Sequence, residues 1–164
     1  MHRVILAAAL GLAACAPGPT PGAGFRQPDA PIWSAAAFAP GQITGDWQQV
    51  AGFSAKPGGC ADGALSFAPA GDALAVTGTL CLNGAAQKVD ATARPAGPGR
   101  LTLEDGQDWW ILWVDSGYRT LAIGTPSGRF GFILDRSALP PDRLAAASEV
   151  FDFNGYTTAA LRPF

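Results

Sequence analysis

The stretch YRTLAIGTPSGRFGFILDR, residues 118–136, contains two apolar runs separated by a turn sequence. The first run covers residues 119–125 and the second covers residues 129–137, one residue beyond the quoted stretch, with Pro126, Ser127 and Gly128 between them. Apolar runs of this length are typical of strands, and clusters of Pro, Ser and Gly favour tight turns. The stretch therefore predicts a β-hairpin.

Six further strand-like runs precede this hairpin, at residues 47–55, 63–69, 72–82, 86–94, 100–104 and 108–115. Turn residues separate them, and Asn83-Gly84 is the strongest two-residue hairpin signal that a sequence can carry. A helical pattern appears only after Pro140-Pro141. Residues 142–153 then place Leu144, Ala147, Val150 and Phe151 at helical spacing.

Eight strands joined by short turns, followed by one helix, predict an all-β fold. We expect an eight-stranded antiparallel up-and-down β-barrel with the C-terminal α-helix packed on its wall. A sandwich of seven or eight strands is the competing architecture. The folded part is long enough for one domain with its own core.

The N-terminal segment has the pattern of an export signal. Met1-His2-Arg3 is followed by eleven apolar residues, 4–14, which are too few to span a membrane but suit a signal peptide. Leu12-Ala13-Ala14-Cys15 resembles the lipobox of bacterial lipoprotein precursors. That resemblance implies removal of residues 1–14, lipidation of Cys15 and, with Ala16 next, sorting to the outer membrane. An ordinary signal peptide without lipidation is the alternative.

Residues 16–31 contain five prolines and three glycines and have little to bury, so we expect a disordered tether. The expected organisation is a signal peptide at 1–14, the lipidated cysteine and tether at 15–31, and the barrel domain at 32–164. Cys60 and Cys81 are an even pair in an exported chain, which predicts a disulfide. Two reduced, buried thiols are the alternative.

Composition argues against several functions. The chain has 11 basic and 13 acidic side chains and no basic cluster, so a nucleic-acid partner is not expected. The one histidine and the one methionine, His2 and Met1, lie in the predicted signal peptide. The mature chain therefore lacks an imidazole for a catalytic triad or a zinc site. We expect no enzyme activity, no metal and no cofactor; a carboxylate-based enzyme is the least favoured alternative.

Several motifs occur in one order along the chain. They are Gly45-Asp46-Trp47, the turn sequence at residues 115–122, the run at residues 132–136, and the later stretches LPPDRL and GYTTAALRPF. Together they resemble the lipocalin family, and in particular bacterial outer-membrane lipocalins and their apolipoprotein D relatives. The resemblance covers residues 38–164. Gln48 and Ser116 depart from the family pattern, which expects aromatic residues there.

The resemblance implies a barrel floor made of Gly45, Trp47 and Arg136, with the guanidinium over the indole face. Strand alternation from Arg136 places Phe130 and Phe132 inside the barrel, and alternation from Trp47 places Phe53 inside. Matching family cavity positions implies that Trp109, Ile111 and Trp113 also face inward. Those six residues are the expected ligand wall. The expected outward residues Trp110, Leu112 and Val114 would lie under the helix.

The expected function is an outer-membrane-anchored lipocalin, on the periplasmic face, that binds, stores or carries a small hydrophobic ligand. An aromatic-lined barrel suits a fatty acid or a lysophospholipid. The membrane contact would be through the Cys15 anchor. The alternative is a barrel filled by its own side chains, which acts as a structural or protein-docking module at the cell envelope. The sequence predicts no oligomeric state.

Overall fold

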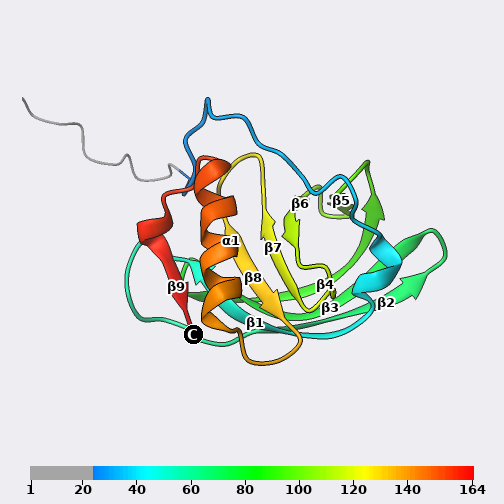
Figure 1. Cartoon of the computed structure of the whole chain (residues 1–164). Coiled ribbons are helices and arrows are strands. Elements are labelled where there is room, and N and C mark those ends of the chain that lie inside the picture. The colour runs from blue at the N-terminus through cyan, green and yellow to red at the C-terminus, as the bar shows by residue number, and fades with distance from the viewer. Residues whose placement is uncertain (1–23) are drawn as a thin grey trace, which may run out of the picture.

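The computed structural model describes residues 24–164, which form a closed antiparallel β-barrel (Figure 1). The expected signal peptide and the Cys15 lipidation site lie outside the described residues. The barrel wall has eight strands: β1 (Gly45–Phe53), β2 (Ala64–Ala70), β3 (Ala73–Leu82), β4 (Ala85–Pro95), β5 (Arg100–Leu103), β6 (Asp108–Val114), β7 (Thr120–Gly124) and β8 (Gly131–Asp135).

Each strand pairs antiparallel with the next one along the chain, and β1 pairs with both β2 and β8. This last pairing closes the sheet. Closure excludes the sandwich alternative, because a sandwich consists of two separate sheets. The predicted up-and-down barrel is therefore confirmed.

The turn between β3 and β4 shows how the local sequence sets the register. Asn83 and Gly84 both have positive φ, 51° and 76°, as a two-residue hairpin turn requires. After this turn β3 and β4 pair along most of their length. Leu82 lies opposite Ala85 beside the turn, and Leu74 lies opposite Ala93 at the far end. The predicted hairpin at this position is confirmed.

One helix and three short elements complete the chain. Helix α1 (Pro141–Phe153) follows Pro140 and packs on the outer face of β6 and β7, as the sequence predicted. The 3₁₀ turn η1 (Pro40–Ile43) precedes β1, and η2 (Thr158–Ala160) follows α1. The three-residue strand β9 (Leu161–Pro163) pairs with the end of β1 and was not predicted.

The barrel wall separates two hydrophobic clusters. The inner cluster fills the barrel and includes Trp47, Phe67, Trp109, Ile111 and Phe132. The outer cluster lies between the wall and α1 and contains eight buried residues: Ala51, Phe53, Leu112, Ala122, Ile133, Ala147, Phe151 and Tyr156. The helix is thus held by burial of apolar surface that the sheet leaves on its outer face.

Residues 24–31 belong to the folded domain, which corrects their assignment to a disordered tether. Arg26 is buried and donates from Nε to the carbonyl oxygen of Asn154 at 2.7 Å and from Nη1 to that of Pro126 at 3.1 Å. The ring of Phe25 packs on Phe53. The amino-acid composition of residues 24–31 did not predict this docking, because it depends on carbonyl groups that lie 100 and 128 residues away in sequence.

Candidate ligand-binding site

The closed end of the barrel is built as the motif implied. Trp47 is fully buried and donates from Nε1 to the carbonyl oxygen of Ile43 in η1 at 2.7 Å. The Arg136 guanidinium lies 4.2 Å from the centre of the indole. Gly45 has a φ of 102°, and a Cβ at this position would lie 3.2 Å from Arg136 Nη1. The positive φ therefore favours glycine, and a side chain here would also crowd the arginine.

Arg136 itself is exposed, although its guanidinium lies over the buried indole. Its guanidinium covers Trp47 and donates to three carbonyl oxygens in two separate segments. These acceptors are Gln42 at 3.2 Å, Thr44 at 3.0 Å and Tyr118 at 3.0 Å. The arginine therefore ties η1 and its C-cap residue to the β6–β7 turn across the closed end.

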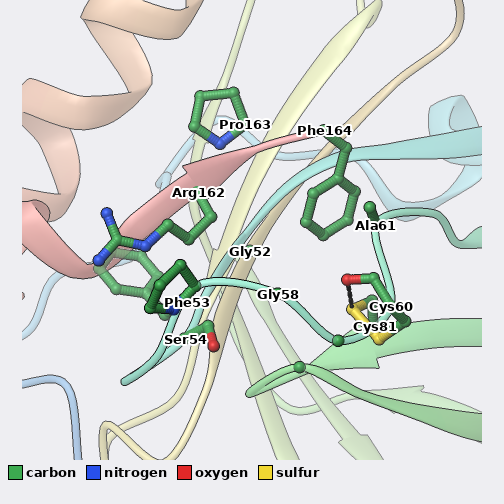
Figure 2. Close-up of a pocket in the computed structure, with 13 residues that line it drawn as sticks. Gly52, Phe53, Ser54, Gly58, Cys60, Ala61, Cys81, Arg162, Pro163 and Phe164 are labelled. Carbon is green, nitrogen blue, oxygen red and sulfur yellow. Dashed lines mark hydrogen bonds between the residues drawn. A yellow bond between two sulfur atoms is a disulfide. The ribbon is translucent and has the colours of Figure 1, made fainter.

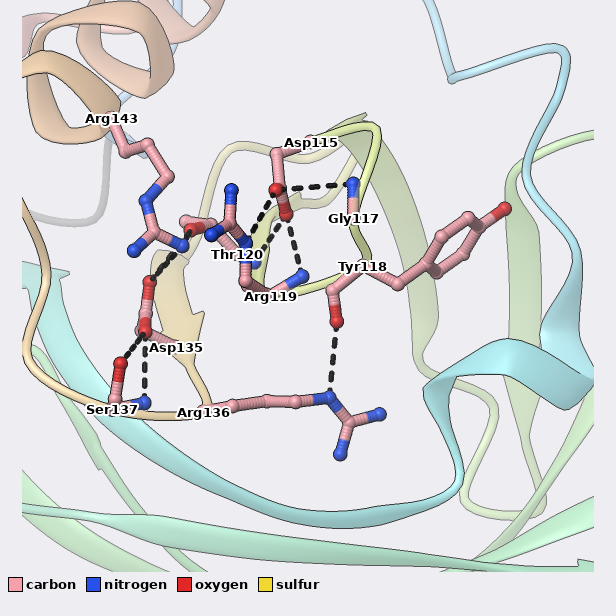
Figure 3. A network of polar contacts seen from close by, with 9 residues as sticks. All are labelled: Asp115, Gly117, Tyr118, Arg119, Thr120, Asp135, Arg136, Ser137 and Arg143. Atoms are coloured by element: carbon pink, nitrogen blue, oxygen red, sulfur yellow. Dashed lines mark hydrogen bonds and ion pairs between the residues drawn. The ribbon is translucent and has the colours of Figure 1, made fainter.

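A polar network beside this end joins the helix to the barrel (Figure 3). The Asp135 carboxylate is fully buried and lies 3.2 Å from Arg143 Nη1 of α1. It also accepts hydrogen bonds from the Thr120 hydroxyl at 2.6 Å and from the Ser137 backbone at 2.8 Å. Every oxygen of this buried carboxylate is therefore satisfied, as burial of a charge requires.

The β6–β7 turn is organised by Asp115. Burial alone would raise the pKa of this carboxyl. Hydrogen bonds from the backbone N–H groups of Thr120, Arg119 and Gly117, and from the Arg119 side chain, outweigh burial and hold the pKa below its usual value. The ionised carboxylate thus holds the turn whose Tyr118 carbonyl oxygen accepts the hydrogen bond from Arg136.

The barrel interior is largely filled by its own side chains. Trp109, Ile111 and Phe132, three of the expected wall residues, do face inward and are at most 1% exposed. Trp109 and Phe132 pack edge to face with ring centres 5.3 Å apart, and the half-buried Phe130 stacks on Phe132 at 6.1 Å. These aromatic residues contact one another where an open cavity was expected.

A pocket remains at the open end, between β3, β4 and the β5–β6 turn, with a volume of about 170 Å³. We call it the mouth pocket. Its apolar lining consists of Leu80, Leu82, Val89, Ala91, Leu103 and Trp109. Its polar rim consists of Gln87, Lys88, Asp90, Glu104, Asp105 and Gln107. The volume is below the roughly 300–1,000 Å³ of typical ligand sites, so it encloses only part of a drug-sized molecule.

The mouth pocket lies where the barrel wall is incomplete. Strand β5 pairs with β4 only at Ala93, Arg94 and Pro95. Beyond the hydrogen bond from Glu104 N–H to the Thr92 carbonyl oxygen, the described residues provide no partner on this side of β4. The first half of β4 is therefore an open edge beside the pocket, which gives a lateral opening toward Trp109.

Two expected wall residues lie outside the barrel. Phe53 belongs to the outer cluster, and the partly buried Trp113 packs against that cluster. The reason is an irregularity in each strand: the register shifts between Gln49 and Ala51 in β1, and between Ile111 and Trp113 in β6. One extra residue reverses the side to which all later side chains point. The same shift moves Val114 to the inner cluster, where it was expected outside.

Phe53 instead lines a second pocket, on the outside of the barrel (Figure 2). This pocket has a volume of about 190 Å³ and lies between the loop after β1 and the C-terminal strand β9. The disulfide between Cys60 and Cys81 forms part of its lining and confirms the predicted pairing. The Phe164 ring lies over the same pocket.

Gln49 supports the disulfide from inside the wall. Its amide accepts from the Cys81 N–H at 2.7 Å and donates to the Cys81 carbonyl oxygen at 2.9 Å. The side chain thus joins β1 directly to β3 next to the disulfide. At this level β2 no longer lies between the two strands, because the β1–β2 pairing ends at Gln48 and Ala64.

Five apolar residues of the mouth pocket were not assigned to the ligand wall from the sequence: Leu80, Leu82, Val89, Ala91 and Leu103. Alternation in residues 72–82 and 86–94 does mark Leu80, Val89 and Ala91 as inward-facing. Alternation cannot tell which inward residues border a free volume, because that depends on how far β5 extends beside β4.

No protein-family model matches the chain, and no curated protein matches it. Several solved structures do match the chain. The siderocalin Ex-FABP, described as acting through dual ligand specificities, matches with a TM-score of 0.57 over 73% of this chain and 91% of its own, at 17% identity. Lobster apocrustacyanin A1 matches with a TM-score of 0.55 over 75% of this chain and 77% of its own, also at 17% identity.

Both of these proteins are lipocalins, so the fold of this chain is the lipocalin barrel. At this level of identity the likeness establishes the fold and no more. Within residues 24–164, no helix combines the length and the apolar character that crossing a bilayer requires. The same residues contain no group of three or more His, Cys, Asp or Glu side chains placed to hold a metal ion.

Proposed function

We propose that the protein binds a small amphiphilic lipid at the mouth pocket while it is anchored to the outer membrane through Cys15. The observation that carries the binding proposal is the mouth pocket itself. It combines an apolar base of leucines and Trp109 with a polar rim, at the open side of an otherwise filled barrel. An apolar chain end would enter the base, and the polar head would stay at the rim.

The rim charges favour one head group over another. Lys88 is the basic side chain of the rim, and Asp90, Glu104 and Asp105 are acidic. Lys88 also pairs with Asp90 at 3.7 Å, which reduces its pull on an anion. A free carboxylate would therefore be repelled by Glu104 and Asp105, whereas an ammonium group would be attracted. We infer a lysophospholipid with an amine head group in preference to a fatty acid.

A plugged pocket tests the binding site directly. Ala91 is half-buried in the apolar lining, and Ala91→Phe would place a ring in the free volume. We expect lysophosphatidylethanolamine to change tryptophan emission in the wild type and to bind at least tenfold more weakly to Ala91→Phe. Ala86→Phe, on the exposed outer face of the same strand, is the matched control and should bind normally. Equal affinity of the two variants would rule out the mouth pocket.

The preference for an amine head group is tested by comparing the affinities of two lipids. Palmitate should bind more weakly than lysophosphatidylethanolamine, and Glu104→Lys combined with Asp105→Lys should reverse this order. An unchanged order in the double variant would show that the rim does not select the head group.

The membrane anchor rests on the sequence motif alone and is tested in cells. The full-length chain with Cys15→Ser should move from the membrane fraction to the soluble periplasmic fraction, because two or three acyl chains give the expected stable anchor. A Cys15→Ser variant that still sediments with membranes would contradict the lipid anchor.

The second candidate function is a docking or structural module, and the tight packing of Trp109 and Phe132 inside the barrel favours it. A barrel without free internal volume can act only through its surface. If neither lysophospholipids nor fatty acids change tryptophan emission, and Ala91→Phe leaves the cellular role intact, the docking module replaces lipid binding.

A further inference from the structure

Two large aromatic side chains are exposed at the C-terminal end of α1. Phe153 is 72% exposed and Trp33 is 60% exposed. The Trp33 backbone N–H donates to Asn154 Oδ1 at 2.6 Å, and Phe153 is the residue that precedes Asn154. The two side chains therefore leave the backbone at neighbouring points. We call them the aromatic pair.

The N-terminal segment is fixed at the same end of the molecule (Figure 1). Arg26 binds the carbonyl oxygens of Asn154 and Pro126, as described above. The Phe25 N–H donates to the Gly128 carbonyl oxygen at 2.6 Å, and the Gln27 N–H donates to that of Gly155 at 2.9 Å. The described chain thus begins against the β7–β8 turn and the C-terminal end of α1.

The distance from this point to the expected anchor is limited by chain length. Eight residues lie between Cys15 and Gly24, so nine Cα–Cα steps join them. A fully extended chain covers at most about 3.3–3.6 Å per step, so Cys15 reaches no further than about 32 Å from Gly24. If Cys15 is in a bilayer, the end of the barrel that bears the aromatic pair is held close to that bilayer.

We propose that Trp33 and Phe153 contact the membrane surface and hold this end of the barrel against it. The inference rests on the proposed lipid anchor at Cys15. Tryptophan and phenylalanine are suited to such a contact, because large apolar rings leave water at the membrane interface and the indole N–H keeps a polar partner.

The charges near the pair indicate a zwitterionic surface. Asp152 precedes Phe153, Asp29 lies between Arg26 and Trp33 in sequence, and both carboxylates are exposed. Arg129 of the β7–β8 turn is an exposed cation at the same end. Charges of both signs give little net attraction to anionic lipids, so the contact should depend on the aromatic rings and only weakly on salt.

The orientation brings the ligand site to the membrane. The β7–β8 turn, which contacts Phe25 and Arg26, lines a common groove with the β5–β6 turn through Phe130, Arg129, Gly106 and Gln107. Gln107 also belongs to the rim of the mouth pocket. The open end of the barrel would therefore face the bilayer, and a lipid could pass between them over a short distance.

A tethered-vesicle experiment tests the contact without relying on lipidation in the cell. The Cys60–Cys81 disulfide leaves Cys15 as the one free thiol of the chain that starts at Cys15. This thiol is coupled to a maleimide lipid in phosphatidylcholine vesicles whose acyl chains carry bromine, a short-range quencher of tryptophan. We expect quenching in the wild type and loss of most of it in Trp33→Ser. Phe153→Ser should reduce the quenching, because it removes half of the contact.

Trp113→Phe is the matched control. Trp113 is partly buried and packs against the outer cluster, so its removal should leave the bromine-dependent quenching in place. Absence of quenching in the tethered wild type, or quenching that Trp33→Ser leaves unchanged, would overturn the proposed contact. Failure of the Cys15→Ser fractionation test would instead overturn the anchor, because the maleimide tether does not depend on natural lipidation.

Discussion

The closed end of the barrel allows a quantitative test of how Trp47 and Arg136 share one contact. Trp47 is fully buried. Trp47→Ala should therefore lower the free energy of unfolding by about 3–5 kcal/mol, as truncation of a core aromatic does. Arg136 is exposed, so its interactions compete with water. Its contact with the indole should add about 0.5–1 kcal/mol to the free energy of unfolding. Its three hydrogen bonds to carbonyl oxygens should together add about the same amount. Arg136→Ala should then cost about 1–2 kcal/mol.

The two losses should not add. Trp47→Ala already removes the indole contact, so Arg136→Ala should cost about 0.5–1 kcal/mol less in that background than in the wild type. Guanidinium chloride unfolding followed by circular dichroism measures all four proteins without relying on tryptophan emission. Arg129→Ala is the matched control, because Arg129 is an exposed arginine at the opposite end of the barrel. Its effect should stay within about 0.5 kcal/mol.

The result that refutes the reasoning is additivity. If the double variant loses the sum of the two single losses, the guanidinium does not stabilise the indole. A loss above 3 kcal/mol for Arg136→Ala alone would also contradict the argument, because it would require a buried charge.

Three further predictions concern other parts of the fold. Replacing Cys60 and Cys81 by serine should cost about 3 kcal/mol, because the disulfide closes a loop with a sequence separation of 21; unchanged stability would show that the loop is already ordered without it. Arg143→Met should cost about 3–5 kcal/mol, because it leaves the buried Asp135 carboxylate unpaired. Asp135→Asn in the same chain should recover part of this loss, and a further loss would contradict the pairing. Burial raises the pKa of Tyr156 from 10.0 to about 12, so the unfolded chain ionises first as the pH rises. The free energy of unfolding should therefore fall by about 2–3 kcal/mol between pH 10 and 12, and Tyr156→Phe should remove that slope.

Local signals in the sequence were sufficient for most of the barrel. The Asn83-Gly84 turn, the Pro-Ser-Gly turn at 126–128 and the apolar runs between them act over a few residues, so they can be recognised without knowing the partner strands. The same holds for α1, whose apolar spacing and preceding prolines predicted its bounds to within one residue. The Trp47–Arg136 contact was found through the family motif, since nothing local relates residues so far apart.

Long-range packing was not predictable in this way. The docking of Arg26 depends on carbonyl groups of Pro126 and Asn154, which become neighbours only in the folded chain. Strand β9 has three residues, too few for a periodic pattern. The filled interior could not be predicted either, because alternation tells which side chains face inward but not whether Trp109 and Phe132 meet in the middle.

The two register shifts have a common physical consequence. The strands β6, β7, β8 and β1 are neighbours in the sheet, and α1 covers the outside of this part of the wall. The register shifts lie in β6 and β1, the first and the last of these four strands. Each shift moves an aromatic residue, Phe53 or Trp113, from the expected interior to the face under α1. There Phe53 packs edge to face on Phe151 of the helix, with ring centres 4.9 Å apart. The barrel thereby loses two aromatic wall residues and gains a helix contact. The pocket that opens from the barrel interior lies on the β3–β5 side, away from the strands that α1 covers, and this is where the proposed ligand would bind.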